Sequence, residues 1–182
     1  MDDDEAVRRA RSGDLDAYEA LVTRYSAVAH RTAVLLGAGA DAEDVVQDSF
    51  VKAFGTLHRF RAGAPFRPWL LRIVVNQTKN LTRGRRRRLA LEVRAGAEPD
   101  RLVDPEQLVL DDLRRDALLA AVRALPLKDQ LVLTCRFFLD LGEEETARVL
   151  DWPRGSVKSR TSRALGRLRE QVGDRGREVT GG

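Results

Sequence analysis

The chain has 182 residues, 43% hydrophobic and 33% charged, which is the composition of a soluble protein with enough apolar residues for a core. Its 32 Lys and Arg residues against 28 Asp and Glu residues give a net charge of +4, and no apolar run approaches the roughly 20 residues of a membrane span. A single cysteine, Cys135, excludes an intrachain disulfide.

Few residues in the chain are suited to catalysis or metal binding. Besides Cys135 there are only His30 and His58, and no carboxylates recur at ligand spacing. We therefore expect no catalytic residues, no metal, no cofactor and no enzyme activity. The acidic N-terminus lacks the apolar segment of a secretory signal, which makes the cytoplasm the expected compartment.

Apolar residues recur at helical spacing along the chain, and sustained period-two alternation is absent, so the sequence predicts an all-α fold. The first predicted helix covers residues 2–12 and the second residues 16–36. A third begins with Asp41 as its N-cap and buries an apolar stripe. The stripe consists of Val45, Val46, Phe50, Ala53, Phe54 and Leu57.

The third helix carries Asp44, Gln47 and Asp48 on another side. Spacing alone leaves two readings equally open, a solvated face and a surface for a partner.

Residues 59–88 hold ten Lys or Arg residues and no acid. After Pro68, which suits a first helical turn, the sequence predicts a helix with a core stripe of Trp69, Leu70, Ile73, Val74, Gln77 and Leu81. Its other face presents only amide and cationic donors, which suit phosphates and base edges. These donors are Arg72, Asn76, Lys79, Asn80 and Arg83.

Aromatic residues precede this helix around a Gly/Pro loop, namely Phe60 and Phe66, with Trp69 in its first turn. Aromatics beside cations bind unstacked bases, so the stretch predicts contact with separated DNA strands. The alternative is a solvated basic helix whose aromatics belong to the core.

Residues 89–107 contain proline, glycine and several acids without an apolar stripe, and are predicted to be a flexible acidic linker. The linker divides two small helical domains, residues 1–88 and 108–175, and residues 176–182 are predicted to form a disordered tail.

The second domain has the pattern of a helix-turn-helix: a short helix over residues 142–150, a turn with Pro153 and Gly155, and a basic helix over residues 156–172. Ser156 is the predicted N-cap of the last helix. Lys158, Ser159, Ser162 and Arg163 lie opposite its apolar stripe, on the side that would meet duplex DNA. The alternative is two packed helices with a solvated basic face.

Three motifs in this order resemble the extracytoplasmic-function (ECF) sigma factors of bacterial RNA polymerase. They are AEDVVQDSFVKAF (42–54), RFRAGAPFRPWLLRIVVNQTKN (59–80) and DWPRGSVKSRTSRALGRLRE (151–170). The resemblance implies a sigma region 2 domain at residues 1–88 and a sigma region 4 domain at 108–175. It also implies a subunit that gives core polymerase its promoter specificity and promotes strand opening.

The resemblance further implies a role for each group of residues. Asp44, Gln47 and Asp48 would dock on the clamp helices of the largest polymerase subunit, while the second domain meets the flap. Residues that melt and hold the −10 element would be Phe60, Arg61, Trp69, Asn76, Lys79 and Asn80, with Arg72 and Arg83 on the same helix face. Lys158, Ser159, Ser162 and Arg163 would read the −35 element. An anti-sigma factor is an expected partner, and no membrane insertion is expected.

In four places the chain departs from the family pattern: Gly142, Thr146, Trp152 and Arg154, all in or beside the helix-turn-helix. The runner-up function is a stand-alone helix-turn-helix regulator that binds duplex DNA without polymerase. A duplex reader has no need for aromatics around a loop, so residues 59–80 favour the sigma factor.

Overall fold

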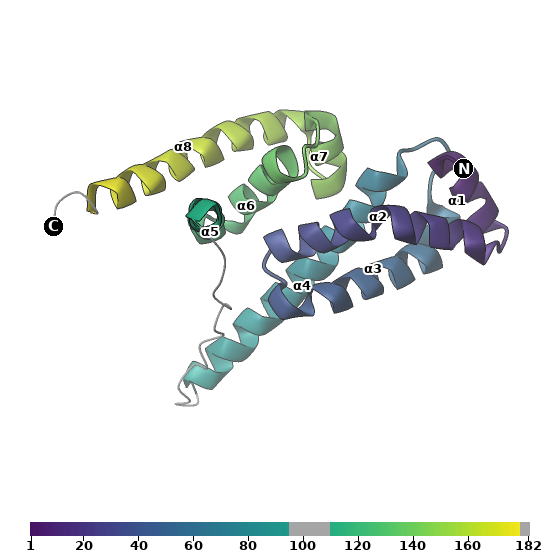
Figure 1. Ribbon diagram of the computed structural model, residues 1–182, viewed down its shortest axis with the longest axis horizontal. Coiled ribbons are helices and arrows are strands. Elements are labelled where there is room, and N and C mark those ends of the chain that lie inside the picture. Colours follow the sequence, from purple (N-terminus) through teal and green to yellow (C-terminus); the bar gives the residue numbers. More distant parts are fainter. Residues whose placement is uncertain (95–109, 179–182) are drawn as a thin grey trace.

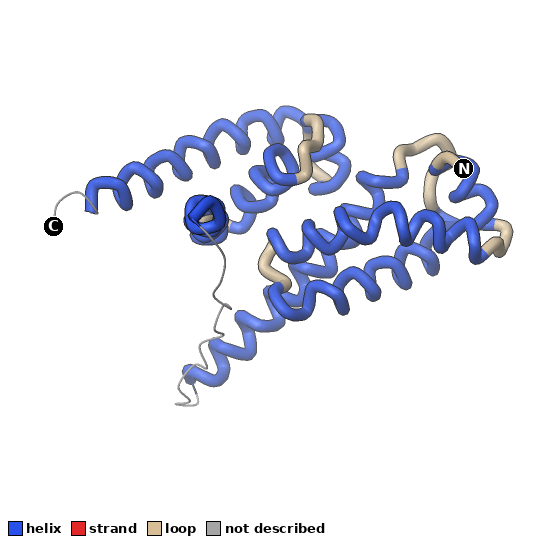
Figure 2. The backbone as a smooth tube through the Cα atoms, viewed as in Figure 1, coloured by secondary structure: helices blue, strands red, loops and turns tan. Residues whose placement is uncertain are grey.

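The computed structural model describes residues 1–94 and 110–178, and these residues form helices and connecting loops without a strand (Figures 1 and 2). Helices α1 to α4 make up one domain and α5 to α8 a second (Figure 1). The predicted all-α fold with two helical domains is confirmed.

The first domain consists of α1 (Asp3–Arg11), α2 (Leu15–Leu35), α3 (Ala42–Thr56) and α4 (Phe66–Arg94). Short 3-10 turns, η1 (Gly39–Asp41) and η2 (Leu57–Arg59), lie before and after α3. Helices α2, α3 and α4 pack against one another, and α1 covers one end of α2. Their shared core is apolar and includes Leu21, Phe50, Leu70 and Val74.

Aspartate side chains cap the N-termini of the first two helices. The Asp2 carboxylate accepts a hydrogen bond from the Glu5 N–H (2.8 Å), and the Asp14 carboxylate accepts one from the Ala17 N–H (3.0 Å). Asp41 occupies the N-cap position of α3 as predicted, but its side chain does not cap. It pairs with Arg85 of α4 instead, so the predicted capping role is wrong.

Helix α4 buries a wider face than its spacing predicts. Leu70 and Val74 of the predicted stripe are fully buried, but so are Leu71 and Val75. The helix continues to Arg94, beyond the predicted end of the first domain at residue 88. The rest of the predicted linker, residues 95–107, lies outside the described residues, which resume at residue 110.

The second domain consists of α5 (Leu110–Ala124), α6 (Leu127–Leu133), α7 (Glu143–Leu150) and α8 (Arg154–Glu178). A π-helical turn, η3 (Thr134–Phe138), extends α6. Because α8 begins at Arg154, directly after Pro153, Ser156 lies inside the first turn and is not the N-cap that the sequence predicted. Helix α8 also runs to Glu178, into the predicted tail, of which residues 179–182 lie outside the described part.

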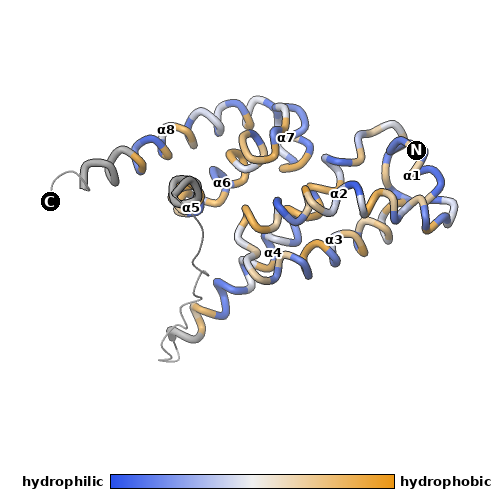
Figure 3. The backbone as a smooth tube through the Cα atoms, in the orientation of Figure 1, coloured by the Kyte–Doolittle hydropathy of each residue, from blue (hydrophilic) through white to orange (hydrophobic). Residues whose placement is uncertain are grey.

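The two domains pack against each other through α4 and α7. Leu36, Leu71 and Val75 of the first domain join the apolar core of the second, which includes Leu139 and Leu150. The Arg67 guanidinium donates to the Leu139 carbonyl across this contact (2.8 Å). Figure 3 shows apolar residues along α4, α6 and α7, the helices that contribute to this shared core. Burial of Leu71 and Val75 thus has its cause in the second domain, which the local spacing of α4 does not reveal.

Candidate nucleic-acid interface

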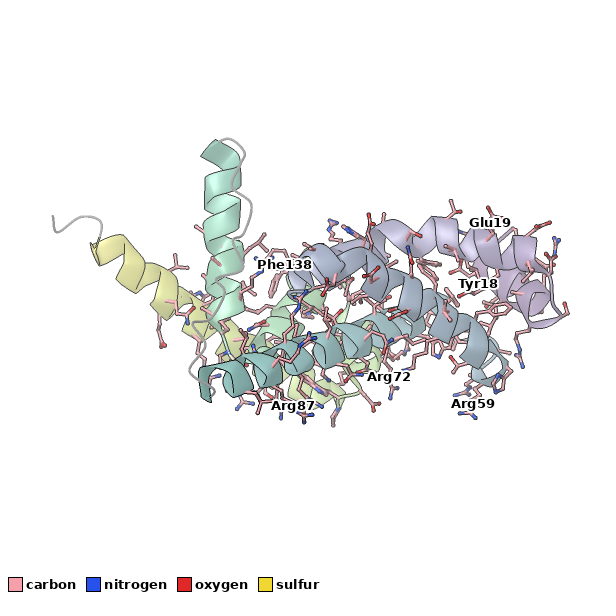
Figure 4. The ribbon with its side chains drawn as sticks, turned by 90° about the horizontal axis from the view of Figure 1, so that it is seen from below. Tyr18, Glu19, Arg59, Arg72, Arg87 and Phe138 are labelled. Atoms are coloured by element: carbon pink, nitrogen blue, oxygen red, sulfur yellow. The ribbon has the colours of Figure 1, made fainter. Side chains whose placement is uncertain are left out.

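The predicted donor face of α4 lies at the surface. Arg72, Asn76, Asn80 and Arg83 are exposed and Lys79 is half-buried. These positions fall on one side of the helix because the opposite side is held in the core by Leu70, Val74 and Val75. Figure 4 shows Arg72 partway along α4, with Arg59 beyond the start of the helix.

A pocket of about 480 Å³ opens where the loop before α4 meets the first turns of the helix. Four of the predicted −10 residues line it: Phe60, Arg61, Trp69 and Arg72. Its remaining wall comes from residues 62–65, Arg59, Pro68 and, from the second domain, Arg148 of α7. Four guanidinium groups beside an indole ring make this pocket suited to a base with its phosphate.

Phe60 and Trp69 differ in how much of each ring is available. Phe60 is only 4% exposed and packs edge-on against Phe66 (5.9 Å) and Trp69 (5.0 Å between ring centroids). Trp69 is half-buried. Phe60 therefore supports the pocket wall from the core, and the Trp69 indole is the aromatic group within reach of a ligand.

The acidic face of α3 is likewise exposed at Asp44, Gln47 and Asp48. Asp44 and Asp48 line a groove of about 400 Å³ between α3 and α4, and Asn80 of the donor face lies on its far wall. The acidic face and the donor face are thus adjacent surfaces of the same two helices.

The arginine run at residues 85–88 divides into two parts. Arg85 is held inside the domain, where it pairs with Asp41 and donates to the Gly37 carbonyl (3.3 Å). Arg86, Arg87 and Arg88 are exposed on the last third of α4, where Figure 4 labels Arg87. Only these three are available to phosphates.

The second donor surface is the outer face of α8. Lys158, Ser159, Ser162 and Arg163 are all exposed, while Val157 and Ala164 are buried against α6 and α7. Arg163 Nε donates to the Ser159 carbonyl one turn earlier (3.3 Å), which restrains its guanidinium along the helix.

Asp129 is a buried charged residue whose ion pairs the sequence did not reveal. It lies in the first turn of α6, is 0% exposed, and pairs with Arg160 (3.2 Å) and Arg167 of α8. A buried carboxylate requires such partners, because removing them leaves a charge without solvation. Its partners lie 31 and 38 positions further along the chain, so only the folded arrangement brings them together.

The remaining reactive groups are not arranged for catalysis. Burial raises the pKa of Cys135 to about 12, so its thiol is protonated at neutral pH. His30 and His58 are exposed on separate elements. Within residues 1–94 and 110–178, no group of three or more His, Cys, Asp and Glu side chains is placed to hold a metal ion. Over the same ranges, none of the helices combines the length and apolarity that a bilayer span requires.

Both halves of the chain match known protein-family models. Residues 17–88 match Sigma-70 region 2, and residues 115–168 match Sigma-70, region 4. The first range contains α3 and most of α2 and α4, including both predicted surfaces of that domain. The second contains Asp129 and the outer face of α8.

Whole-chain comparisons agree with the family models. The ECF RNA polymerase sigma-E factor of Salmonella typhimurium is 35% identical over 176 aligned residues, covering 90% of this chain and 91% of the relative. Among solved structures, CnrH in complex with the cytosolic domain of CnrY matches with a TM-score of 0.74 and 25% identity, over 94% of this chain and 97% of that one. The sigma factor RpoE of Bartonella quintana, solved with the anti-sigma factor NepR, has the same fold, with a TM-score of 0.69 and 24% identity over 85% and 96% of the two chains.

Proposed function

Because the chain belongs to the ECF sigma factors, RNA polymerase subunits that recognise promoters, we propose that it docks on core polymerase through α3 and contacts promoter DNA through α4 and α8. The observation that carries this proposal is the pair of exposed donor faces, one on each domain, of which the first adjoins an aromatic pocket. A specificity subunit of this kind needs no catalytic groups of its own.

The −10 element is assigned to α4 and the loop before it. A base that leaves the duplex loses a few kcal/mol of stacking and pairing, which contacts in the pocket must offset. Trp69 offers a stacking surface, Arg61 and Arg72 offer charge, and Phe60 supports the indole from behind. Further along the helix, Asn76 and Asn80 can bond base edges, while Lys79 and Arg83 neutralise strand phosphates.

The −35 element is assigned to the outer face of α8. A helix-turn-helix places the N-terminal part of its second helix in the major groove, and this part of α8 carries Lys158, Ser159, Ser162 and Arg163. Lysine and arginine donate to guanine or to phosphate, and serine bonds any base or phosphate.

Core polymerase is assigned to Asp44, Gln47 and Asp48, with the clamp helices of the largest subunit as their partner and the flap as the partner of the second domain. The exposure of the three side chains on one helix supports this assignment, since a docking face must be free in the unbound subunit. The adjoining position of Asn80 would place the −10 strand beside the docked polymerase.

We place the region 2 domain at residues 1–88, the linker at 89–107 and the region 4 domain at 108–175, although α4 itself extends to Arg94. The compartment is the cytoplasm, where bacterial RNA polymerase transcribes. An anti-sigma factor is a further proposed partner, because the sigma factor RpoE of Bartonella quintana, which has the same fold, was solved with the anti-sigma factor NepR.

Reconstitution with core polymerase tests the function. The purified chain is mixed with core polymerase and a promoter of the family, and transcripts are measured together with the reactivity of −10 thymines to permanganate. We expect promoter-dependent transcripts and opened DNA only when both proteins are present. Tight binding of the free chain to duplex, without a complex with polymerase, would favour the stand-alone regulator instead.

A further inference from the structure

A second cationic pocket lies at the junction of α6 and α8, beside the outer face of α8. It has a volume of about 220 Å³ and is lined by Lys128, Trp152, Pro153, Ser156, Arg160 and Arg163. Three of these six side chains are cations, and they come from two separate helices. None of the lining residues carries a negative charge.

The charge balance of this pocket favours an anion. In the part of the chain that the structure describes, neither Lys128 nor Arg163 pairs with a carboxylate. Arg160 pairs with Asp129 through Nη1 alone, and a guanidinium has five N–H donors in a fixed plane. Like charges drawn together at a pocket repel one another, and a bound anion removes that repulsion.

Asp129 holds one side of the pocket in position. Its carboxylate is fully buried and binds Arg160 with one oxygen and Arg167 with the other. These arginines are two helical turns apart on α8, so one carboxylate fixes both the helix and the Arg160 guanidinium. A group ordered before binding loses less conformational entropy when its ligand arrives.

Resting on the proposed function, we propose that Lys128, Arg160 and Arg163 bind one backbone phosphate of the −35 duplex, and that Asp129 is the positioning residue of this clamp. Arg163, whose Nε donates to the Ser159 carbonyl, lines the pocket at the N-terminal part of α8, where a recognition helix is flanked by the phosphates at the edge of the groove. A phosphate contact fixes the register of the helix and carries no sequence information. The clamp would therefore set where α8 lies, while Ser162 and Lys158 read the bases.

Salt dependence of promoter binding distinguishes a phosphate clamp from other roles. Holoenzyme reconstituted with Lys128→Ala is titrated with promoter fragments at low temperature, before strand opening, over a series of salt concentrations. The slope of log affinity against log salt should decrease in magnitude by about 0.9. Affinity should fall by the same factor on fragments with an intact and with a scrambled −35 element. The matched control is Arg31→Ala, which removes an exposed cation from α2 and should leave the slope unchanged.

A neutral phosphate analogue identifies the contact. Methylphosphonate is placed at each −35 phosphate in turn. At one position it should weaken the wild-type holoenzyme, and it should weaken Lys128→Ala less, because in that variant only Arg160 and Arg163 still contact the phosphate. Independent losses at every position would overturn the clamp, as would an unchanged salt slope. If Lys128→Ala weakened assembly with core polymerase instead, the pocket would serve a protein partner and the proposal would be wrong. A wild-type chain that formed no holoenzyme would contradict the proposed function rather than the clamp.

The positioning role of Asp129 can be tested because it predicts a change in DNA affinity opposite to the change that charge alone predicts. Asp129→Asn makes the domain more positive, which by charge alone strengthens DNA binding. If Asp129 orients the clamp, the variant should bind DNA more weakly. Binding is measured well below the unfolding temperature of the variant, which is determined by circular dichroism. Binding that is equal or tighter would show that Asp129 only stabilises the fold. Lys128→Ala changes an exposed side chain, so the clamp remains testable even if Asp129→Asn does not fold.

Discussion

Arg72 Nη2 and Asp151 Oδ2 form an ion pair at 2.8 Å that joins the donor face of α4 to the turn before α8. The pair connects the element assigned to −10 with the helix-turn-helix assigned to −35. Both side chains are partly exposed, 44% and 71%, so the pair itself adds at most about 1 kcal/mol. The apolar contacts of Leu71 and Val75 beside it supply most of the attraction between the domains.

This contact predicts that the domains separate on the promoter. Elements centred at −35 and −10 lie roughly 85 Å apart along B-form DNA, at about 3.4 Å for each base pair. Domains that touch through α4 and α7 cannot contact both at once. Energy transfer between dyes on Gly55→Cys and Glu144→Cys should be high in the free chain and low in the holoenzyme on promoter DNA. Cys135 should not take up dye, because it is buried and its thiol is protonated. Equal transfer in both states would contradict separation.

The docking assignment predicts a selective loss of polymerase binding. Asp48→Arg reverses one exposed charge of α3 and should weaken binding to core polymerase by about tenfold or more, a change of about 1.4 kcal/mol. Competition against a labelled sigma factor measures the loss. Asp16→Arg makes the same reversal at an exposed position of α2 and serves as the control. Equal losses in the two variants, or none in Asp48→Arg, would exclude α3 as the docking face.

Two residues of α4 should affect different steps of initiation. Asn76→Ala removes a base-edge donor and should reduce strand opening by about tenfold, while binding before opening changes little. Arg83→Ala removes a cation from the same exposed face and should weaken closed binding and its salt dependence. Fluorescence of 2-aminopurine in the −10 element reports opening, and anisotropy at low temperature reports closed binding. Identical effects of the two variants on both measurements would mean that Asn76 contacts only phosphate.

How far the sequence predicts this molecule depends on the distance between interacting residues. Periodicity within each helix predicts the helices and the exposed faces of α4 and α8, because one face of each is held in a local core. Long-range partners were not predictable. Leu71 and Val75 are buried by the second domain, Asp41 pairs with Arg85 and does not cap α3, and Asp129 meets two arginines of α8.

In the candidate site, too, features set by local helix periodicity are predictable and features set by distant residues are not. The donor positions Asn76 and Lys158 follow from their place on a helix face. The burial of Phe60 does not follow from helix periodicity, because Phe60 is buried by Phe66 and Trp69, which the loop between residues 60 and 66 brings against it. The pocket at Lys128 combines α6 with α8, so no single motif contains it.

Thr146 in α7 is a position where the helix-turn-helix can be stabilised. Its side chain is fully buried, and among the described residues Oγ1 has no hydrogen-bond partner. A buried hydroxyl without a partner costs about 1–3 kcal/mol, and an apolar group of the same shape removes that cost. Thr146→Val should therefore raise the free energy of unfolding by about 1 kcal/mol, measured in urea with Trp152 fluorescence as the reporter of this domain.

The matched control for Thr146 is Thr32 in α2, which is equally buried but donates to the Val28 carbonyl at 2.7 Å. Thr32→Val makes the same chemical change and removes a hydrogen bond that contributes about 1 kcal/mol, so it should leave stability unchanged or lower it. The difference between the two variants arises from the hydrogen-bond partner of each hydroxyl and not from the substitution. If both variants gained stability equally, added apolarity alone would explain the effect, and the unpaired Thr146 hydroxyl would not be its cause.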